Sequence, residues 1–199
     1  ATPDQKIIDI INSNGGKAIL TSREHQTGTD RIYEVFKIQL NNEPNILVNL
    51  QGDMPNIDPQ AITDLVSYMN KGKCDIGTLA SSFNSEVELK DENNVKVAVN
   101  EKLTVNSFGK AIDFSRTASN TYKNIYHHIG IYAFTNKALV RYVSLERSKL
   151  ELERKLEQLR ALENNMIIHV GYVNSSPLSV DTKNDLIEVK KIMENNGKN

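Results

Sequence analysis

The segment from residue 45 to residue 69 limits the possible folds of this chain more than any other part of the sequence. Asn45–Leu50 (NILVNL) is a run of apolar and β-branched residues, as expected for a strand that is buried on both faces. The turn residues Gln51–Asp53 end this run, and Asp58-Pro59 then supplies a cap and a first-turn proline for a helix that extends to about Met69. A buried strand followed by a helix predicts an α/β fold with a parallel, helix-flanked sheet.

The same alternation of helices and strands extends over most of the chain. Before this segment we expect a helix capped by Thr2, a short strand and an amphipathic helix around Phe36, and after it we expect further strands and helices. The expected strands are Lys17–Thr21, Asp75–Ser82, Ala111–Ser115, Tyr126–Phe134 and Met166–Val173, and the later helices begin at Asn136, at Ser148 (to about Glu163) and at Thr182.

Two short apolar runs, Val87–Leu89 and Val95–Val99, interrupt this alternation. The polar residues between them are typical of a hairpin connection, so the sequence predicts a β-hairpin here. We interpret residues 84–125, approximately, as an insertion within a single domain that spans residues 1–199.

Charge and cysteine content exclude several classes of function. The chain has 24 Lys and Arg residues against 25 Asp and Glu residues, so it has no overall basic field that would attract nucleic acid or an anionic membrane. The single Cys74 excludes an internal disulfide and a thiolate-rich zinc site, and it fits a reducing compartment. No apolar run approaches the ~18 to 20 residues that cross a bilayer. We therefore expect a cytoplasmic protein that binds neither nucleic acid nor membrane.

The loop Gln51–Pro55 carries the clearest chemical signal. Glycine lets the backbone approach a ligand, Gln51 offers a donor and an acceptor, and Asp53 follows a buried strand, where a carboxylate can bind a hard cation. Asp181, before the last helix, is a second candidate, and two carboxylates are enough for Mg²⁺ that bridges a triphosphate. The structural alternatives are that Gly52-Asp53 is only a turn and that Asp181 only supports a helix cap.

Two basic positions are also ambiguous. Thr27–Arg31 combines a glycine, two hydroxyls and a guanidinium at a helix start, which suits a nucleotide, although Asp30 and Arg31 are equally explained as a capping carboxylate and a solvated charge. Arg116 has the planar fork that binds a carboxylate, but most single arginines are surface charges.

Two histidines and two neighbouring polar residues of one expected helix complete the set of candidate site residues. Alternation along a strand should send His127 and His128 to opposite faces, so one of them is expected to have no direct role. Glu157 and Gln158 lie in the expected long helix, where the default for such a pair is a solvated face.

Several familiar catalytic motifs are absent from the sequence. It has no Walker-type phosphate loop, no G-x-G-x-x-G after a strand, no paired-cysteine metal motif and no G-x-S-x-G nucleophile motif. Covalent catalysis therefore has no good candidate, and any chemistry must rest on positioning and charge.

Six blocks of sequence, in this order, resemble the CMP-Kdo synthetases, or 3-deoxy-manno-octulosonate cytidylyltransferases. Each block alone is weak, but together they cover nearly the whole chain. The blocks are TSREHQTGTDR (Thr21–Arg31), NLQGDMPNIDP (Asn49–Pro59), FSR (Phe114–Arg116), HHIGIYAF (His127–Phe134), LEQLRALE (Leu156–Glu163) and VDTKNDL (Val180–Leu186).

The resemblance implies a fold, a reaction and a site. The fold is a Rossmann-like nucleotidyltransferase with a mixed, mostly parallel sheet flanked by helices and an inserted β-hairpin region. The reaction joins CMP from CTP to 3-deoxy-manno-octulosonate (Kdo) for lipopolysaccharide synthesis and releases pyrophosphate. A homodimer formed through the inserted region is also implied. By position, Asp53 and Asp181 would hold Mg²⁺ and act in catalysis with Gln51, while Gly28, Asp30 and Arg31 would bind the nucleotide, and Arg116, His128, Tyr132, Glu157 and Gln158 would bind Kdo.

Two departures from the family pattern leave alternatives open. The family's Q-G-D-E-P has Met54 in place of its glutamate. The family also begins with a strand and a basic phosphate loop, on the order of 40 residues, that we expect to precede Ala1. The alternatives are a CMP-sialic acid synthetase-like enzyme, or an inactive, truncated remnant that only binds sugar or dimerises.

Overall fold

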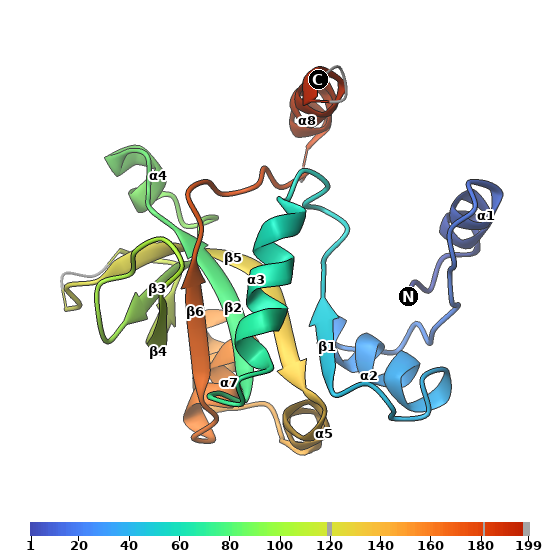
Figure 1. Ribbon diagram of the computed structural model, residues 1–199, viewed down its shortest axis with the longest axis horizontal. Coiled ribbons are helices and arrows are strands. Elements are labelled where there is room, and N and C mark those ends of the chain that lie inside the picture. The colour runs from blue at the N-terminus through green and yellow to red at the C-terminus, as the bar shows by residue number, and fades with distance from the viewer. Residues whose placement is uncertain (119–120, 181, 197–199) are drawn as a thin grey trace.

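The computed structural model describes residues 1–118, 121–180 and 182–196, and its centre is one sheet (Figure 1). In their order across the sheet, the described strands are β1 (Ile46–Asn49), β5 (Ile125–Thr135), β2 (Ile76–Ser81), β6 (Ile168–Tyr172), β4 (Phe108–Ser115) and β3 (Lys96–Val99). The helices are α1 (Gln5–Ser13), α2 (Gly28–Ile38), α3 (Pro59–Met69), α4 (Glu86–Lys90), α5 (Asn136–Ser144), α6 (Lys149–Arg154), α7 (Gln158–Glu163) and α8 (Lys183–Asn196).

The directions of the strands make the sheet mixed. Both β1 and β2 pair antiparallel with β5, whereas β6 is parallel to β2. β4 is antiparallel to β6, and β3 is antiparallel to β4 and to β5. Four of the six described strands thus run in one direction, which confirms the expected mixed, mostly parallel sheet. The long strand β5 nevertheless runs antiparallel between β1 and β2, so β2 and β6 are the one parallel pair of neighbours among the described strands.

Helices cover both faces of the sheet, as the α/β pattern predicts. On one face, Leu65 and Met69 of α3 pack with Leu79 and Ile131. On the other face, α2, α5 and α7 contribute buried apolar side chains to a larger cluster that includes Tyr132. The site described below lies on this second face.

The N-terminal segment differs from expectation. Asp4, rather than Thr2, caps α1, because its carboxylate accepts a hydrogen bond from the Lys6 amide. Lys17–Thr21 is not a strand, since its one ladder contact in the described structure is an isolated bridge between Leu20 and Thr2. Leu20 is 56% exposed, so an apolar run here does not mark a buried strand.

The inserted region contains a helix where a strand was predicted. Val87–Leu89 lies within α4, which Ser85 caps: the Ser85 hydroxyl accepts a hydrogen bond from the Glu88 amide, and the Glu88 carboxylate accepts one from the Asn84 amide just before the cap. The hairpin partner of β3 is therefore β4. The predicted hairpin between Val87–Leu89 and Val95–Val99 is therefore wrong, because its first segment is helical and β3 is the first strand of the hairpin that forms.

The long helix expected from Ser148 to Glu163 is two helices. The capping box of Ser148 and Glu151 is confirmed, but Lys155 adopts a left-handed conformation with φ of 55° and ends α6. The direction of the chain changes at this corner, and Leu152, which a single unbroken helix would place on the same side as Leu156 and Leu159, is 52% exposed. The turn determines where Glu157 and Gln158 point.

Gly77 in β2 lies where α3 packs most closely on the sheet. A Cβ atom at Gly77 would lie 2.8 Å from Leu65 Cδ1 and 2.8 Å from Met69 Sδ. We expect Gly77→Ala to lower the free energy of unfolding by about 1–3 kcal/mol in urea titrations, because overpacking forces these side chains aside. Gly52→Ala is the matched control, since no atom lies within 4 Å of its Cβ position. Equal losses in both variants would contradict this account of the packing.

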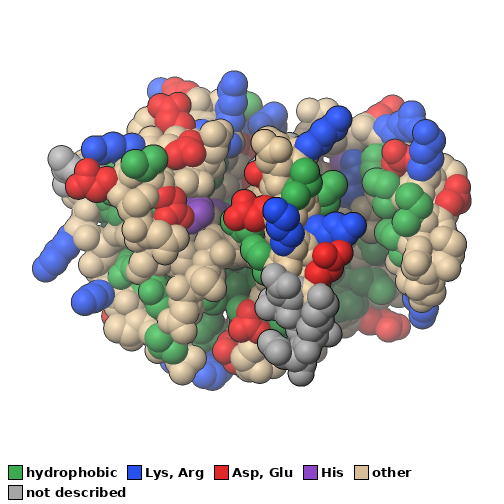
Figure 2. Space-filling view, turned by 90° about the horizontal axis from the view of Figure 1, so that it is seen from above, with side chains coloured by type: hydrophobic (Ala, Val, Ile, Leu, Met, Phe, Trp, Pro, Cys, Tyr) green, Lys and Arg blue, Asp and Glu red, His purple; other side chains and the backbone are tan. Residues whose placement is uncertain are grey.

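The surface carries charges of both signs. Seen from above, Lys and Arg side chains are interspersed with Asp and Glu side chains, and no continuous basic patch covers this face in the part of the chain that the structure describes (Figure 2). Among the described helices, none has the length and apolar character to span a membrane.

Candidate functional site

An irregularity in the pairing of β5 marks the centre of the candidate site. Thr78 of β2 pairs with Tyr132, but the next residue, Leu79, pairs with Ile129. The two residues between them on β5 therefore bulge out of the ladder. Bulges re-aim side chains and are common beside active sites.

His128 and Tyr132 lie together on the face covered by α2, α5 and α7. Their ring centroids are 5.4 Å apart, and the Phe114 ring meets His128 edge-on at 5.1 Å. His127 points the other way, where its Nδ1 atom lies 3.1 Å from the Glu88 carboxylate. The prediction that the two imidazoles diverge is confirmed, and His128 is the one near the site.

The α6–α7 corner brings Glu157 and Gln158 to the same place. The Thr29 hydroxyl of α2 donates to the Glu157 carboxylate over 3.3 Å, and Thr29, Tyr132, Glu157 and Gln158 line one small crevice. Burial raises the pKa of Glu157, and hydrogen bonds from Thr27 and Thr29 only partly offset this effect. Neither Glu157 nor Gln158 therefore lies on a solvated face. The structure brings them together with His128 and Tyr132, and these four are among the five residues that the resemblance implies for Kdo.

The end of β1 adjoins this group. Asn49 pairs with Tyr132 and is 6% exposed, yet its Nδ2 atom has no hydrogen-bond partner in the described structure. A Cβ atom on Gly28, the first residue of α2, would lie 3.7 Å from Nδ2. The Asn49 amide therefore lies beside a helix N-terminus, where backbone N–H groups favour an anion.

Gln51 extends the site from β1 across the bulge. A Cβ atom on Gly130 would lie 3.9 Å from Gln51 Nε2, which shows how closely the loop approaches β5. A cavity of about 600 Å³ includes Gly28, Arg31, Asn49 and Gln51 in its lining.

Asp53 reaches the segment that precedes α8. Its backbone oxygen accepts a hydrogen bond from the Val180 amide at 2.8 Å, and its Oδ2 atom accepts one from the Ser179 hydroxyl at 3.4 Å. Its Oδ1 atom is buried without a hydrogen-bond partner in the described structure. Asp181, the other predicted metal ligand, lies outside the described residues, and among the described residues no group of three or more His, Cys, Asp and Glu could hold a metal ion.

Met54 stands where the family pattern has glutamate, and it faces the core. It is 8% exposed and packs in the cluster of Leu65, Leu79 and Ile129 under α3. The loop thus keeps one acidic side chain toward Ser179 and uses the next position as an apolar anchor.

Asp30 and Arg31 are held by local partners. The Thr27 hydroxyl donates to Asp30 Oδ2 at 2.9 Å and accepts from the Asp30 amide, as in a helix cap. Arg31 Nη1 donates to the Thr21 hydroxyl and, at 2.9 Å, to the Ser22 carbonyl. The Ser22 amide and His25 both bond to Glu34, and these contacts lower the pKa of Glu34, His25 having the largest effect. Asp30 and Arg31, two of the three residues predicted to bind the nucleotide, therefore order the loop before α2.

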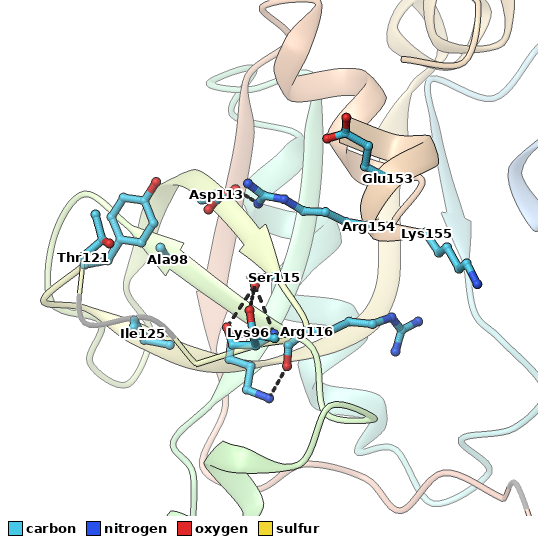
Figure 3. A pocket seen from close by; sticks show the side chains of 12 residues that line it. Lys96, Ala98, Asp113, Ser115, Arg116, Thr121, Ile125, Glu153, Arg154 and Lys155 are labelled. Atoms are coloured by element: carbon cyan, nitrogen blue, oxygen red, sulfur yellow. Dashed lines mark hydrogen bonds and ion pairs between the residues drawn. The ribbon is translucent and has the colours of Figure 1, made fainter. Parts of the chain in front are cut away.

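Arg116 lies apart from the other predicted sugar-binding residues. Residues on β4 alternate, so Phe114 faces His128 while Asp113 and Ser115 line a separate cavity of about 570 Å³ (Figure 3). Arg116 Nη1 donates to the Glu92 carbonyl, and its side chain extends to the same side of this cavity as Lys155. No described contact joins Arg116 to the Glu157 crevice.

The sequence gives no separate signal for Thr78, and it assigns no individual role to Asn49 or Thr29. Asn49 lies at the end of the predicted strand and begins one of the family-like blocks, and Thr29 is one of the two hydroxyls in the Thr27–Arg31 segment. The contacts of Thr29 with α7 and of Thr78 with β5 join residues that are distant in sequence, so no local pattern reveals them.

Comparisons with known proteins agree with this arrangement. The sequence pattern of the cytidylyltransferase family matches residues 1–168. The 3-deoxy-manno-octulosonate cytidylyltransferase of Rickettsia canadensis (strain McKiel) is 42% identical over 98% of this chain and 78% of its own length. The enzyme of the same name from Bartonella henselae (strain Houston 1) is 42% identical over 97% of this chain and 79% of its own.

A solved structure supports the same assignment. The structure of CMP:2-keto-3-deoxy-manno-octonic acid synthetase complexed with CTP superposes with a TM-score of 0.84 and 33% identity, over 97% of this chain and 78% of that one. Sequence and fold thus agree over nearly the whole chain. The chain therefore belongs to the cytidylyltransferase family, among the 3-deoxy-manno-octulosonate cytidylyltransferases.

Proposed function

We propose that this protein transfers CMP from CTP to Kdo and releases pyrophosphate. The relatives that bear this activity in their names match the chain over 97–98% of its length. The related structure that is complexed with CTP supports CTP as the nucleotide.

One observation carries the proposal within the structure. Two buried polar atoms near the end of β1, Asn49 Nδ2 and Asp53 Oδ1, have no hydrogen-bond partner in the described part of the chain. Leaving such groups unpaired costs roughly 1–3 kcal/mol each, so they mark a place where a ligand completes the bonding. They lie on either side of Gln51 in the sequence, and Asn49 pairs with Tyr132, which lines one crevice with Glu157 and Gln158.

Mg²⁺ fits the residues present. Mg²⁺ prefers carboxylate oxygens and needs one or two of them when phosphates supply further ligands. The unpaired Oδ1 atom of Asp53 is such a ligand, and we propose that Asp181, which follows Val180, is the second. When bound, the metal ion would neutralise phosphate charge and polarise the phosphorus.

The residues of the chain would then act by positioning. The anomeric hydroxyl oxygen of Kdo forms the new bond to the α-phosphorus of CTP while the bond to pyrophosphate breaks, and no protein nucleophile takes part. Glu157, Gln158, His128 and Tyr132 hold the sugar, and Asn49 with the N-terminus of α2 receives anionic or polar oxygens. Arg116 would serve this site only if the Glu92 contact were exchanged for the Kdo carboxylate.

Two further proposals concern the state of the protein. We propose a homodimer formed through the inserted region at about residues 84–125, supported by the exposed apolar side chains of Val87, Val105 and Ile112. We propose a cytoplasmic location, with which a single cysteine, Cys74, is consistent.

A substrate panel tests the function. With CTP and Mg²⁺, we expect pyrophosphate release with Kdo and at least about a hundredfold less with N-acetylneuraminate, because the site pairs buried polar groups with one sugar. A preference for N-acetylneuraminate would favour the sialic acid alternative. The binding-only alternative is tested by the same assay together with a measurement of Kdo binding; inactivity with every sugar, together with retained Kdo binding, would favour it.

A further inference from the structure

Thr78, a residue of β2 that the proposed reaction does not itself use, lies behind His128. Its side chain is fully buried opposite the bulge of β5. Its hydroxyl oxygen lies 2.7 Å from the Ile131 carbonyl, 3.2 Å from the Ile129 carbonyl and 2.9 Å from His128 Nε2. One hydroxyl thus bridges the backbone of the bulge and the imidazole.

The number of protons that this cluster can donate determines which ring nitrogen of His128 is protonated. A hydroxyl has one proton to donate, and a carbonyl oxygen can only accept. The Thr78 proton therefore belongs to the close Ile131 carbonyl, and the hydroxyl oxygen must accept from His128. His128 consequently carries its proton on Nε2, and its Nδ1 atom is a lone-pair acceptor.

His128 also stays neutral. Burial, together with the neighbouring His127, lowers its pKa to about 3. The surrounding side chains agree, since Phe114 and Tyr132 flank the ring and neither supplies a carboxylate. No described contact occupies Nδ1, so this acceptor is available to a ligand.

We infer that Thr78 is a positioning residue that locks His128 in the Nε2–H form, so that Nδ1 accepts a hydrogen bond from a hydroxyl of the sugar. This rests on the proposed function. The consequence is selective, because a neutral acceptor favours a hydroxyl donor and disfavours a carboxylate or phosphate oxygen, which can only accept. His128 therefore reads a hydroxyl of Kdo and not its carboxylate.

The tautomer can be observed without any assay of activity. In ¹⁵N-histidine NMR of the wild-type protein, with its four histidines assigned by single substitutions, we expect His128 to show a protonated Nε2 and an unprotonated Nδ1. Thr78→Val should shift population to the Nδ1–H form, whereas Thr63→Val, at an exposed helical threonine bonded to the Pro59 carbonyl, should leave the spectrum of His128 unchanged. A protonated Nδ1 in the wild-type protein overturns the inference, whether or not the protein is active with Kdo.

Kinetics separate positioning from a merely structural role. We expect Thr78→Val to raise the KM for Kdo about tenfold while the KM for CTP and kcat change less than about twofold, and Thr78→Ser to restore the wild-type KM. An unchanged KM for Kdo in a folded Thr78→Val variant would overturn the inference. If Thr78→Val does not fold, the inference is tested by the tautomer of His128 in the wild-type protein and by the KM of Thr78→Ser for Kdo. If Kdo is not a substrate, the proposed function and the contact of Nδ1 with Kdo both fail, whereas the NMR result still decides whether Thr78 sets the tautomer of His128.

Discussion

Asp53→Asn is expected to lower kcat for pyrophosphate release by at least about a hundredfold while the protein remains folded. The Oδ1 atom of Asp53 is buried and unpaired, and the one described side-chain contact of this carboxylate is the long hydrogen bond that Oδ2 accepts from the neutral Ser179 hydroxyl. Its charge is therefore neutralised by no described ion pair and is available to a cation. Asparagine keeps the shape and one oxygen but removes the negative charge. Because the Val180 contact uses the backbone oxygen of residue 53, the substitution leaves that contact in place.

The control for this result is another aspartate. Asp9 on α1 accepts a hydrogen bond only from the exposed Gln5 side chain among the described contacts, so Asp9→Asn should keep kcat within about twofold. Steady-state rates and thermal unfolding are measured for both variants. Near-normal turnover by folded Asp53→Asn would refute the metal role.

Glu151→Leu is expected to destabilise the protein by about 3–5 kcal/mol, the largest stability effect we expect for a single substitution. Glu151 is fully buried and receives two hydrogen bonds from Arg160, at 2.6 and 2.8 Å, and one from Arg147 at 3.0 Å. Removing the carboxylate leaves the Arg160 charge buried without its partner. Urea unfolding measures the loss.

A double variant tests that mechanism. Adding Arg160→Met to Glu151→Leu should recover most of the lost stability, because both buried charges are then gone. The exposed pair of Lys190 and Glu194 is the control, and Glu194→Gln should leave the unfolding curve unchanged. If the double variant is as unstable as Glu151→Leu, the unpaired charge is not the cause.

The same ion pair has a pH dependence of known sign. Burial opposes the charge of Glu151, but the hydrogen bonds from Arg160 and Arg147 outweigh it and hold its pKa below the ordinary value of 4.5. A lowered pKa stabilises the folded state above pH 4.5, and this stabilisation is lost as the pH falls through the folded-state value. The difference in free energy of unfolding between the wild type and Glu151→Leu should therefore become smaller below pH 4.5.

Local chemistry made much of the fold predictable. The strand at Asn45–Leu50 and the Asp58-Pro59 helix start are confirmed because capping and burial leave a signature within a few residues. The same holds for the Ser148–Glu151 capping box. Ser85 also caps a helix, α4, and this local signal competes with the apolar run Val87–Leu89 that favours a strand.

Long-range pairing was not predictable from this one sequence. Nothing in Tyr126–Phe134 reveals that its strand runs antiparallel between β1 and β2, because alternation is the same in either direction. The default expectation of a solvated face for Glu157-Gln158, above which only the family resemblance raised them, is wrong for a related reason. It assumed an unbroken helix, whereas the left-handed Lys155 turns the chain and aims both residues at Thr29 and Tyr132.

The site residues could be identified only from the family resemblance and the structure together. Their spacing alone could not show that residues 53 and 180 touch, since such contacts depend on the whole sheet. The structure, in turn, places Arg116 in the lining of a separate cavity. No local sequence pattern distinguishes an arginine in this position from one that contacts the sugar.

The central claim, that Asp53 and Asp181 hold one divalent cation, is tested most directly by iron-mediated backbone cleavage of the intact protein. Fe²⁺ bound in place of Mg²⁺ and treated with ascorbate and peroxide generates radicals that cut the nearest backbone. We expect cuts near both residue 53 and residue 181 that excess Mg²⁺ suppresses and that Asp53→Asn abolishes. Cutting near only one of the two residues, or at neither, would contradict the account.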